Sequence, residues 1–244
     1  MIPVDPHGIL EGIELVVFDK DGTLIEFEPM WRDWVAELAR DLSAATGRPL
    51  AEPVYALMGV DPETGVIQPH GLLAATPMAR LRELLVAFVA DEGFPLLDAE
   101  AAVAAAWDPP DPVALATPTT DLGALLDRLD ARRIRAAVAT ADDREPTERT
   151  LAALGIASRM AALSCADDGH PGKPAPDPIL RIAATVGVDP DRILVVGDAP
   201  ADLRMGRAAH VRRVVGVLSG VGDRAMLAPL ADAVLDSIAD LAPG

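Results

Sequence analysis

The stretch that decides the fold is IELVVF, residues 13–18, followed at once by DKDGT, residues 19–23. The first part is apolar and rich in β-branched residues, which predicts a short buried strand that ends in a polar turn. Gly22 permits a sharp turn that would bring the carboxylate of Asp21 back toward that of Asp19. Two acids at a buried strand end are costly unless something neutralises them, and a divalent cation would do so. A plain Asp-Gly turn remains an equally open interpretation of this stretch alone.

Working outward, similar apolar stretches predict further strands, and amphipathic stretches between them predict helices. The expected strands cover residues 134–139, 161–165, 193–196 and 211–217, with a weaker candidate at 233–235. Helical spacing of apolar residues is clearest in 122–129 and 179–186. This alternation is typical of a parallel sheet with helices on both faces. We therefore expect an α/β fold with a doubly wound, Rossmann-like sheet, whose ligand lies at the carboxyl ends of the strands.

Residues 27–117 interrupt this alternation. They carry helical patterns, including one face formed by Trp31, Trp34, Val35, Leu38 and Leu42, a second run at 78–90 and a third at 99–107. We expect a mostly helical domain inserted directly after the first strand and its turn. The predicted domains are a catalytic core of residues 1–26 and 118–244, and the insertion of residues 27–117.

A second pair of carboxylates follows another expected strand. Gly197 and Asp198 come directly after residues 193–196, and Asp202 follows four residues later. Carboxylates at two strand ends supply the oxygen ligands of a magnesium site. Asp198 could instead cap the next helix, but this explanation accounts poorly for acids at two strand ends.

Two more polar residues lie where a phosphoryl group could be bound. Thr140 ends the strand at 134–139, and Lys173 precedes an expected helix. A hydroxyl and an ammonium suit phosphoryl oxygens, although a helix cap and a surface lysine explain each residue equally well alone. Of the 21 basic residues only Lys20 and Lys173 are lysines. This usage favours a chemical requirement for an ammonium at Lys173 but not at Lys20, and two lysines could also persist by chance.

Taken together, these motifs resemble those of a known family. Their order is Asp-x-Asp-Gly-Thr, then Thr140, then Gly-Lys-Pro around Lys173, then Gly-Asp-x-x-x-Asp at 197–202. The pattern resembles the haloacid dehalogenase superfamily, in its phosphoglycolate-phosphatase-like branch, over residues 12–241. The insertion is similar to the helical cap, of the C1 type, that this family places after its first motif.

The resemblance implies a role for each motif residue. Asp19 matches the nucleophile that becomes an aspartyl phosphate, and Asp21 matches the general acid that protonates the leaving oxygen and later activates water. Thr140 and Lys173 match the pair that binds the transferring phosphoryl group. Such transfer depends mostly on positioning and on stabilisation of charge.

The resemblance also implies a magnesium ion. It would be held by the carboxylate of Asp19, the backbone carbonyl of Asp21, and Asp198. Asp202 matches either a direct ligand or a residue behind the ligands, and we favour the second position. Lys20, between the two acids, and Arg32, in the insertion, are expected to contact the substrate.

The expected function is a Mg²⁺-dependent phosphatase of a small phosphorylated metabolite that acts through an aspartyl phosphate. A phosphomutase of the same superfamily shares these core motifs and stays an alternative. A carbon–halogen hydrolase is disfavoured because it would not need Asp21. A non-catalytic regulatory module is disfavoured because the whole motif set is intact.

The composition limits the expected partners and cellular location of the protein. Half of the 244 residues are hydrophobic, enough for a packed core, and the formal net charge of −17 argues against nucleic-acid binding. The single cysteine, Cys165, excludes an internal disulfide. Residues 1–12 lack the basic residues of a signal peptide, and no apolar stretch is long enough to span a membrane. We therefore expect a cytoplasmic monomer or homodimer.

Overall fold

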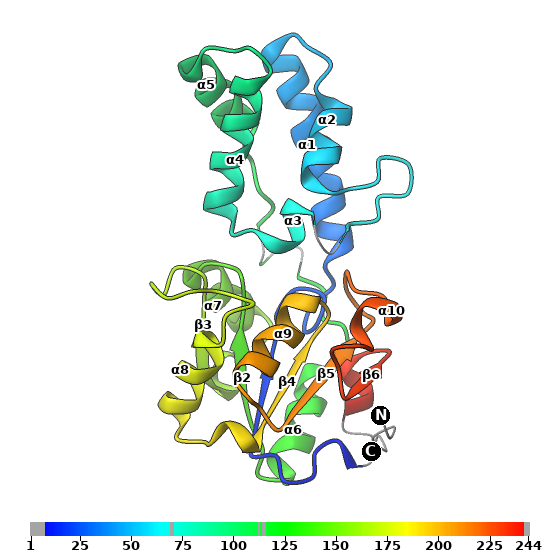
Figure 1. Cartoon of the computed structure of the whole chain (residues 1–244), viewed down its shortest axis with the longest axis vertical. Helices are drawn as coiled ribbons and strands as arrows, with labels where there is room; N and C mark the ends of the chain where they lie inside the picture. The colour runs from blue at the N-terminus through cyan, green and yellow to red at the C-terminus, as the bar shows by residue number, and fades with distance from the viewer. Residues whose placement is uncertain (1–7, 69–70, 112, 114–115, 242–244) are drawn as a thin grey trace. The chain divides into compact units, whose positions relative to one another are not determined.

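In a computed structural model that describes residues 8–68, 71–111, 113 and 116–241, the chain divides into two compact units. The core unit comprises Met1–Phe27 and Ala116–Gly244, and the cap unit comprises Glu28–Leu115. The prediction of a helical insertion between the first two strands is confirmed (Figure 1). The boundaries at 26/27 and 117/118, as limits of separately folding domains, stay a prediction.

The core unit is built on a six-stranded parallel sheet. Its strands are β1 (Leu15–Phe18), β2 (Arg135–Ala139), β3 (Met160–Ser164), β4 (Ile193–Gly197), β5 (Arg213–Val217) and β6 (Ala233–Leu235). They lie in the order β3-β2-β1-β4-β5-β6, and every neighbouring pair is parallel. The chain starts in the middle and winds outward first on one side of β1 and then on the other. The doubly wound sheet expected from the alternating pattern is therefore confirmed.

The register of the three central strands sets where their ends lie. Phe18 of β1 is level with Val138 of β2 and with Val196 of β4. The residues that follow these strands therefore emerge at one edge of the sheet. This edge is where parallel α/β proteins bind their ligands.

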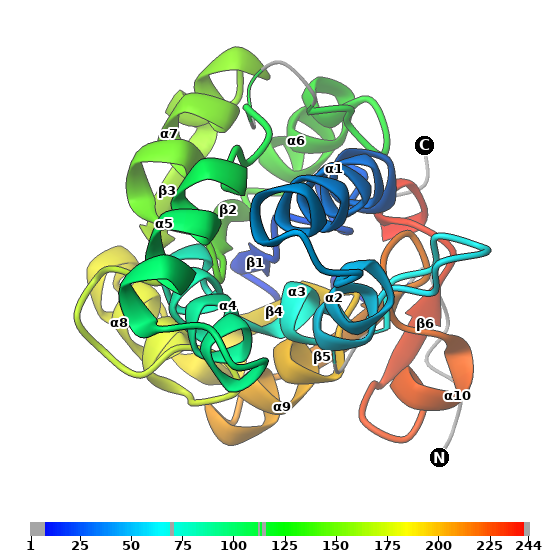
Figure 2. The ribbon, with the colours of Figure 1, turned by 90° about the horizontal axis from the view of Figure 1, so that it is seen from above.

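Helices cover both faces of the sheet. Val16 and Phe18 share one apolar cluster with α6 (Leu122–Ala131) and α7 (Arg144–Ala153). Leu15 and Val17 share another with α8 (Asp177–Val186) and α9 (Pro200–Ala208), and α10 (Arg224–Leu227) joins this second cluster. Figure 2 shows α6 and α7 on the opposite side of the sheet from α8 and α9. This is why residues 15–18 are apolar without interruption: both faces of β1 are buried.

The cap unit is helical. It contains α1 (Glu28–Thr46), α2 (Ala51–Met58), α3 (Leu72–Ala75), α4 (Met78–Asp91) and α5 (Leu96–Ala106). Helix α1 packs against α2 and α5, and α4 packs against α5. The apolar face predicted for α1, from Trp31 to Leu42, is buried. Trp34 stands edge-on to Trp31 and Trp107, with ring centroids 5.5 and 5.2 Å apart. These large rings pack together in the helical core.

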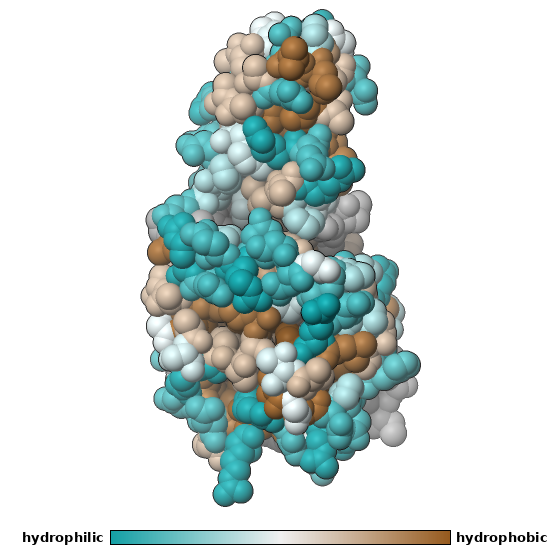
Figure 3. All heavy atoms as spheres, turned by 90° about the vertical axis from the view of Figure 1, so that its left-hand side faces the viewer, coloured by the Kyte–Doolittle hydropathy of each residue, from teal (hydrophilic) through white to brown (hydrophobic). Residues whose placement is uncertain are grey.

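Apolar side chains also reach the surface of the cap unit. Leu96 and Leu97 at the start of α5 are 59% and 77% exposed, and Figure 3 shows apolar atoms on the surface of this unit. Within the described ranges, no helix combines the length and apolarity needed to cross a membrane. Of residues 1–12, which lack the basic residues of a signal peptide, residues 1–7 lie outside the described ranges. Localisation therefore stays a prediction.

Candidate active site

Each residue singled out in the core unit lies at or near the carboxyl ends of the central strands. Asp19 directly follows β1, Thr140 follows β2 and Asp198 follows β4. Asp202 belongs to the first turn of α9. Lys173 comes from the loop between β3 and α8, and its ammonium reaches Asp19. The shared register of β1, β2 and β4 therefore brings residues far apart in the sequence to one place.

The turn after β1 folds back tightly on itself. Gly22 has a φ of 80° and donates its N–H to the carbonyl of Ile25 at 2.7 Å. A Cβ at this position would collide with the carboxylate of Asp198. A glycine is therefore required here for two reasons: the backbone is left-handed, and the carboxylate of Asp198 leaves no room for a Cβ.

Three buried carboxylates form a cluster at this edge. One oxygen of each of Asp19, Asp198 and Asp202 lies within 4.8 Å of the others. The residues are only 8%, 3% and 2% exposed. Like charges this close in a dry environment repel strongly, so the cluster requires positive charge.

Lys173 supplies part of that charge. Its ammonium donates to Oδ1 of Asp19 and, at 2.6 Å, to Oδ1 of Asp202. The side chain is 8% exposed. Burial alone would lower the pKa of Lys173, but Asp19 and Asp202 outweigh it and raise the pKa above its usual range. Lys173 is therefore a permanent cation.

One ammonium does not balance three carboxylates. Burial raises the pKa of Asp19 well above its ordinary value, with Lys173 acting against this and the neighbouring acids adding to it. Burial, followed by the charge of Asp202, raises the pKa of Asp198 to about 7. Three carboxylates against one ammonium leave an excess of negative charge held by oxygen donors alone. A hard divalent cation such as Mg²⁺ fits this donor set.

Asp202 differs from its two neighbours because both of its oxygens are already engaged. Oδ1 accepts from Lys173, and Oδ2 accepts from the backbone N–H of Ala199 at 3.0 Å. This second bond also caps the start of α9. Asp202 is thus one of the three possible ligands by distance, but its contacts suit holding Lys173 in place.

A glycine-containing loop after β5 surrounds Asp198. The backbone N–H of Val221 donates to Oδ2 of Asp198 at 2.8 Å, and a Cβ on Gly220 would collide with the same carboxylate. Ser219 ties this loop to the first one through a 2.7 Å bond to the carbonyl of Gly22. Residues 219–222 were not singled out from the sequence. Their position directly after an expected strand was the available signal.

A second buried ammonium lies beside Asp21. Nζ of Lys20 is 2.7 Å from Oδ1 of Asp21 and 2.9 Å from Oδ2 of Asp142. The Lys20 side chain is 1% exposed, whereas the two acids are 15% and 19% exposed. Burial raises the pKa of Asp21 to about 6, and Lys20 acts against that rise. Asp142 was not singled out from the sequence, since nothing in the chain's order reveals its partner.

Thr140 is held ready to donate. Its hydroxyl oxygen accepts the backbone N–H of Asp142 at 3.1 Å, and its own N–H donates to the carbonyl of Ser164 at 2.9 Å. The oxygen already acts as an acceptor, so the hydroxyl hydrogen can be directed to a phosphoryl oxygen.

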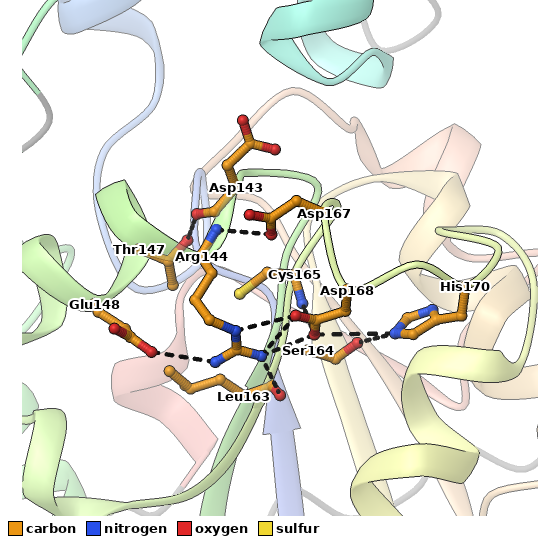
Figure 4. A network of polar contacts seen from close by, with 10 residues as sticks. All are labelled: Asp143, Arg144, Thr147, Glu148, Leu163, Ser164, Cys165, Asp167, Asp168 and His170. Carbon is orange, nitrogen blue, oxygen red and sulfur yellow. Dashed lines mark hydrogen bonds and ion pairs between the residues drawn. The ribbon is translucent and has the colours of Figure 1, made fainter.

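A polar network fastens the segment after β3, which leads to Lys173 (Figure 4). Arg144, at the start of α7, directs its guanidinium to both oxygens of Asp168 at 2.8 Å. Asp168 also accepts the backbone N–H of Cys165 at 2.9 Å. Oγ of Ser164, the last residue of β3, lies 3.1 Å from Nε2 of His170 in this segment. The Arg144–Asp168 pair thus ties the loop after β2 to the loop that carries Lys173.

Arg32 lies in the cap unit, on α1. Its side chain is 52% exposed, and its Nε is 3.4 Å from Oδ1 of Asp33. The aliphatic part of Arg32 also lies against Gly65, where a Cβ would collide with it. Arg32 therefore touches the turn at 59–65. The role of Arg32 toward substrate stays a prediction.

Comparison with known proteins adds independent information. A family model described as haloacid dehalogenase-like hydrolase matches residues 13–210. The chain is 33% identical over 200 residues to a phosphoglycolate phosphatase of Rhodospirillum rubrum, covering 82% of this chain and 78% of that protein. It is 29% identical over 211 residues to the fructose-1-phosphate phosphatase YqaB of Escherichia coli, covering 82% and 94%.

A solved structure agrees on the fold. A predicted phosphoglycolate phosphatase from Haemophilus somnus matches with a TM-score of 0.66 over 95% of this chain and 97% of that one. The sequence identity is 18%, so this likeness supports the architecture alone.

Proposed function

The chain belongs to the haloacid dehalogenase-like hydrolases, and from that membership we propose that it is a Mg²⁺-dependent phosphatase of a small phosphorylated metabolite. The observation that carries this proposal is the buried cluster of Asp19, Asp198 and Asp202 around the Lys173 ammonium. An arrangement of oxygen donors and one fixed cation is what phosphoryl transfer requires.

In the first step Asp19 is the nucleophile. One of its carboxylate oxygens bonds to phosphorus while the bond from phosphorus to the leaving oxygen breaks, which gives an aspartyl phosphate. Asp21 gives its proton to the leaving oxygen. Lys173 opposes the rise that burial causes in the pKa of Asp19, and Lys173 and Thr140 bind the phosphoryl oxygens.

In the second step Asp21 has lost its proton and acts as a base. It takes a proton from water, whose oxygen attacks phosphorus while the bond to Asp19 breaks. Inorganic phosphate leaves and both acids return to their starting states. A pKa of about 6 lets Asp21 serve in both directions near neutral pH.

The residues that would hold Mg²⁺ are Asp19, Asp198 and the backbone carbonyl of Asp21. When bound, the ion neutralises the excess charge of the cluster and of the phosphoryl oxygens. We assign Asp202 to fixing Lys173, because both of its oxygens are engaged in other bonds. The glycines at 22 and 220 allow the backbone to approach Asp198 closely.

Substrate choice is assigned to the cap unit, with Arg32 and the turn at 59–65 as the residues expected to read the leaving group. The named relatives act on phosphoglycolate and fructose 1-phosphate, so small phosphorylated acids and sugars are the first class to test. A phosphomutase would yield an isomeric phosphate in place of inorganic phosphate. In a carbon–halogen hydrolase Asp21 would have no role, because no leaving oxygen needs a proton.

The test is a screen of phosphorylated metabolites for release of inorganic phosphate in Mg²⁺, with product analysis by NMR. We expect phosphate release from at least one small monoester by the native protein and none by Asp19→Asn. Isomer formation without phosphate release would favour the mutase. Phosphate release that persists in Asp19→Asn would overturn the proposal.

A further inference from the structure

Each lysine of the chain joins two carboxylates, but the mechanism proposed above uses only Lys173. Lys20 makes the other bridge, from Asp21 to Asp142, at 2.7 and 2.9 Å. These three residues are called the Lys20 bridge below. The bridge joins the segment after β1 to the segment after β2, two neighbouring strands.

Both ends of the Lys20–Asp142 contact are fixed through the backbone. The carbonyl of Lys20 accepts the N–H groups of Leu24 and Ile25 at 2.9 and 3.1 Å. Asp142 donates its N–H to the hydroxyl of Thr140 at 3.1 Å, and its carbonyl accepts the N–H of Ala166 at 2.8 Å. The ammonium of Lys20 therefore has a fixed position, and Asp21 is held against it.

The same geometry argues against direct contact between Lys20 and substrate. The side chain is 1% exposed, and the ammonium lies at ion-pair distance from two carboxylates. A phosphoryl group would have to displace one of these acids to reach it. Lys173, by contrast, lies beside the proposed nucleophile Asp19. These contacts therefore indicate a role for Lys20 that differs from the substrate contact expected from its place in the motif.

We propose, resting on the function proposed above, that Lys20 is a positioning residue which holds the Asp21 carboxyl for proton transfer and is itself anchored by Asp142. The ammonium engages Oδ1 of Asp21, so the transferable proton is carried on Oδ2. In the first step the Oδ2–H bond breaks and that proton goes to the leaving oxygen. In the second step Oδ2 takes a proton from water.

The choice of lysine fits this duty. An ammonium is a compact charge with three donors on a flexible stem, whereas a guanidinium is a larger planar fork. A closed space between two carboxylates admits the first more readily than the second. The chain uses arginine for its other 19 basic residues, all but Lys20 and Lys173.

The experiment compares two aryl phosphates that differ by one nitro group and therefore in how much their leaving groups need an acid. p-Nitrophenyl phosphate has an acidic leaving group and phenyl phosphate has a less acidic one. The measured quantity is the ratio of kcat/KM for the first substrate to that for the second. Lys20→Met, Asp142→Asn and Asp21→Asn are compared with the native protein, and Asp143→Asn is the matched control on the next residue.

We expect Asp21→Asn to raise the ratio by ~10²-fold or more. Lys20→Met should raise it by ~10-fold or more, and Asp142→Asn by a few-fold, since both let the acid move from its place. Asp143→Asn should leave it unchanged. The double variant Lys20→Met/Asp21→Asn should show the same ratio as Asp21→Asn, because the lysine acts through that acid.

Other outcomes separate the possible failures. An unchanged ratio in both Lys20→Met and Asp142→Asn would overturn the positioning role, and an equal rise of KM for both substrates in Lys20→Met would make Lys20 a substrate ligand. An unchanged ratio in Asp21→Asn together with an active Asp19→Asn would overturn the proposed function instead. If Lys20→Met does not fold, Asp142→Asn and Lys20→Met/Asp142→Asn, which removes one charge of each sign, decide the question.

Discussion

Two regions at the carboxyl edge of the sheet use the same device in different surroundings. On the β4 side of β1, Lys173 lies among three buried carboxylates, and on the β2 side Lys20 lies between two. Burial raises the pKa of Asp198 to about 7 in the first region and of Asp21 to about 6 in the second. The first region has charge left over for a metal ion, and the second has one acid suited to carry a proton.

The largest effect should come from removing Asp19, the proposed nucleophile of the first region. Asp19→Asn keeps the shape of the side chain but loses its charge, so turnover should fall by ~10⁴-fold or more. Rapid-quench labelling with radioactive substrate should place phosphate on Asp19 in the native protein and on no residue of the variant. Label on any other residue would contradict the assignment.

The second effect concerns the surplus charge itself. Chelation of Mg²⁺ should abolish turnover, and Ca²⁺ should restore it poorly because its looser coordination disturbs the geometry of transfer. Addition of Mg²⁺ should raise the melting temperature of the native protein, since a ligand that binds only the folded state stabilises it. Asp198→Asn should lose that rise. Full turnover in the presence of a chelator would contradict the assignment of a metal ion to this region.

The two regions should also separate kinetically. Lys173→Met should lower kcat/KM by ~10²- to 10³-fold, the typical loss when one donor to a transition-state oxygen is removed. Because Lys173 is proposed to bind the phosphoryl group, the loss should be equal for p-nitrophenyl and phenyl phosphate. A loss confined to phenyl phosphate would mean that Lys173, and not Lys20, positions the general acid Asp21.

A smaller effect follows from pH. As the proposed acid, Asp21 must be protonated for the first step, and its pKa is raised to about 6 by burial. For phenyl phosphate, kcat/KM should therefore fall as pH rises above about 6, by roughly tenfold per unit. Ionisation of the substrate affects every variant alike, so Asp21→Asn is the control and should lack this extra fall. Identical profiles for the two proteins would exclude Asp21 as the acid.

The smallest effect should come from the network that fastens the Lys173 loop. Arg144→Met removes a bidentate ion pair with Asp168. Because the arginine side chain is 39% exposed, solvent weakens this ion pair. The free energy of unfolding should fall by about 1 kcal/mol or less. Activity should fall a few-fold through displacement of Lys173, with an unchanged ratio between the two aryl phosphates. Chemical denaturation and steady-state kinetics measure both.

The sequence predicted the sheet well because the deciding signals are local. Apolar runs such as 13–18 and 193–196 are strands with both faces buried, and local periodicity suffices to identify them. The rule that parallel strands end at one edge then brings Asp19, Thr140 and Asp198 together without knowledge of any contact.

The sequence did not reveal the pairings between segments. Nothing local links Lys20 to Asp142, or Arg144 to Asp168, since each pair depends on which strands become neighbours. The loop at 219–222 was missed for the same reason, because its task is to surround an acid from another strand. The burial of Lys20 was also beyond prediction, as its place between two acids is compatible with pointing inward or outward.

The burial of both lysines makes the native chain nearly inert to amine chemistry. With side chains 1% and 8% exposed and each ammonium paired with two acids, neither offers a free amine to an acylating reagent. Apart from an α-amino group, lysine-directed labels and crosslinkers should modify this protein only when local or global unfolding exposes Lys20 or Lys173. The rate of acylation at Lys20 and Lys173, followed by mass spectrometry, therefore reports how often each side of β1 opens, without any engineered probe.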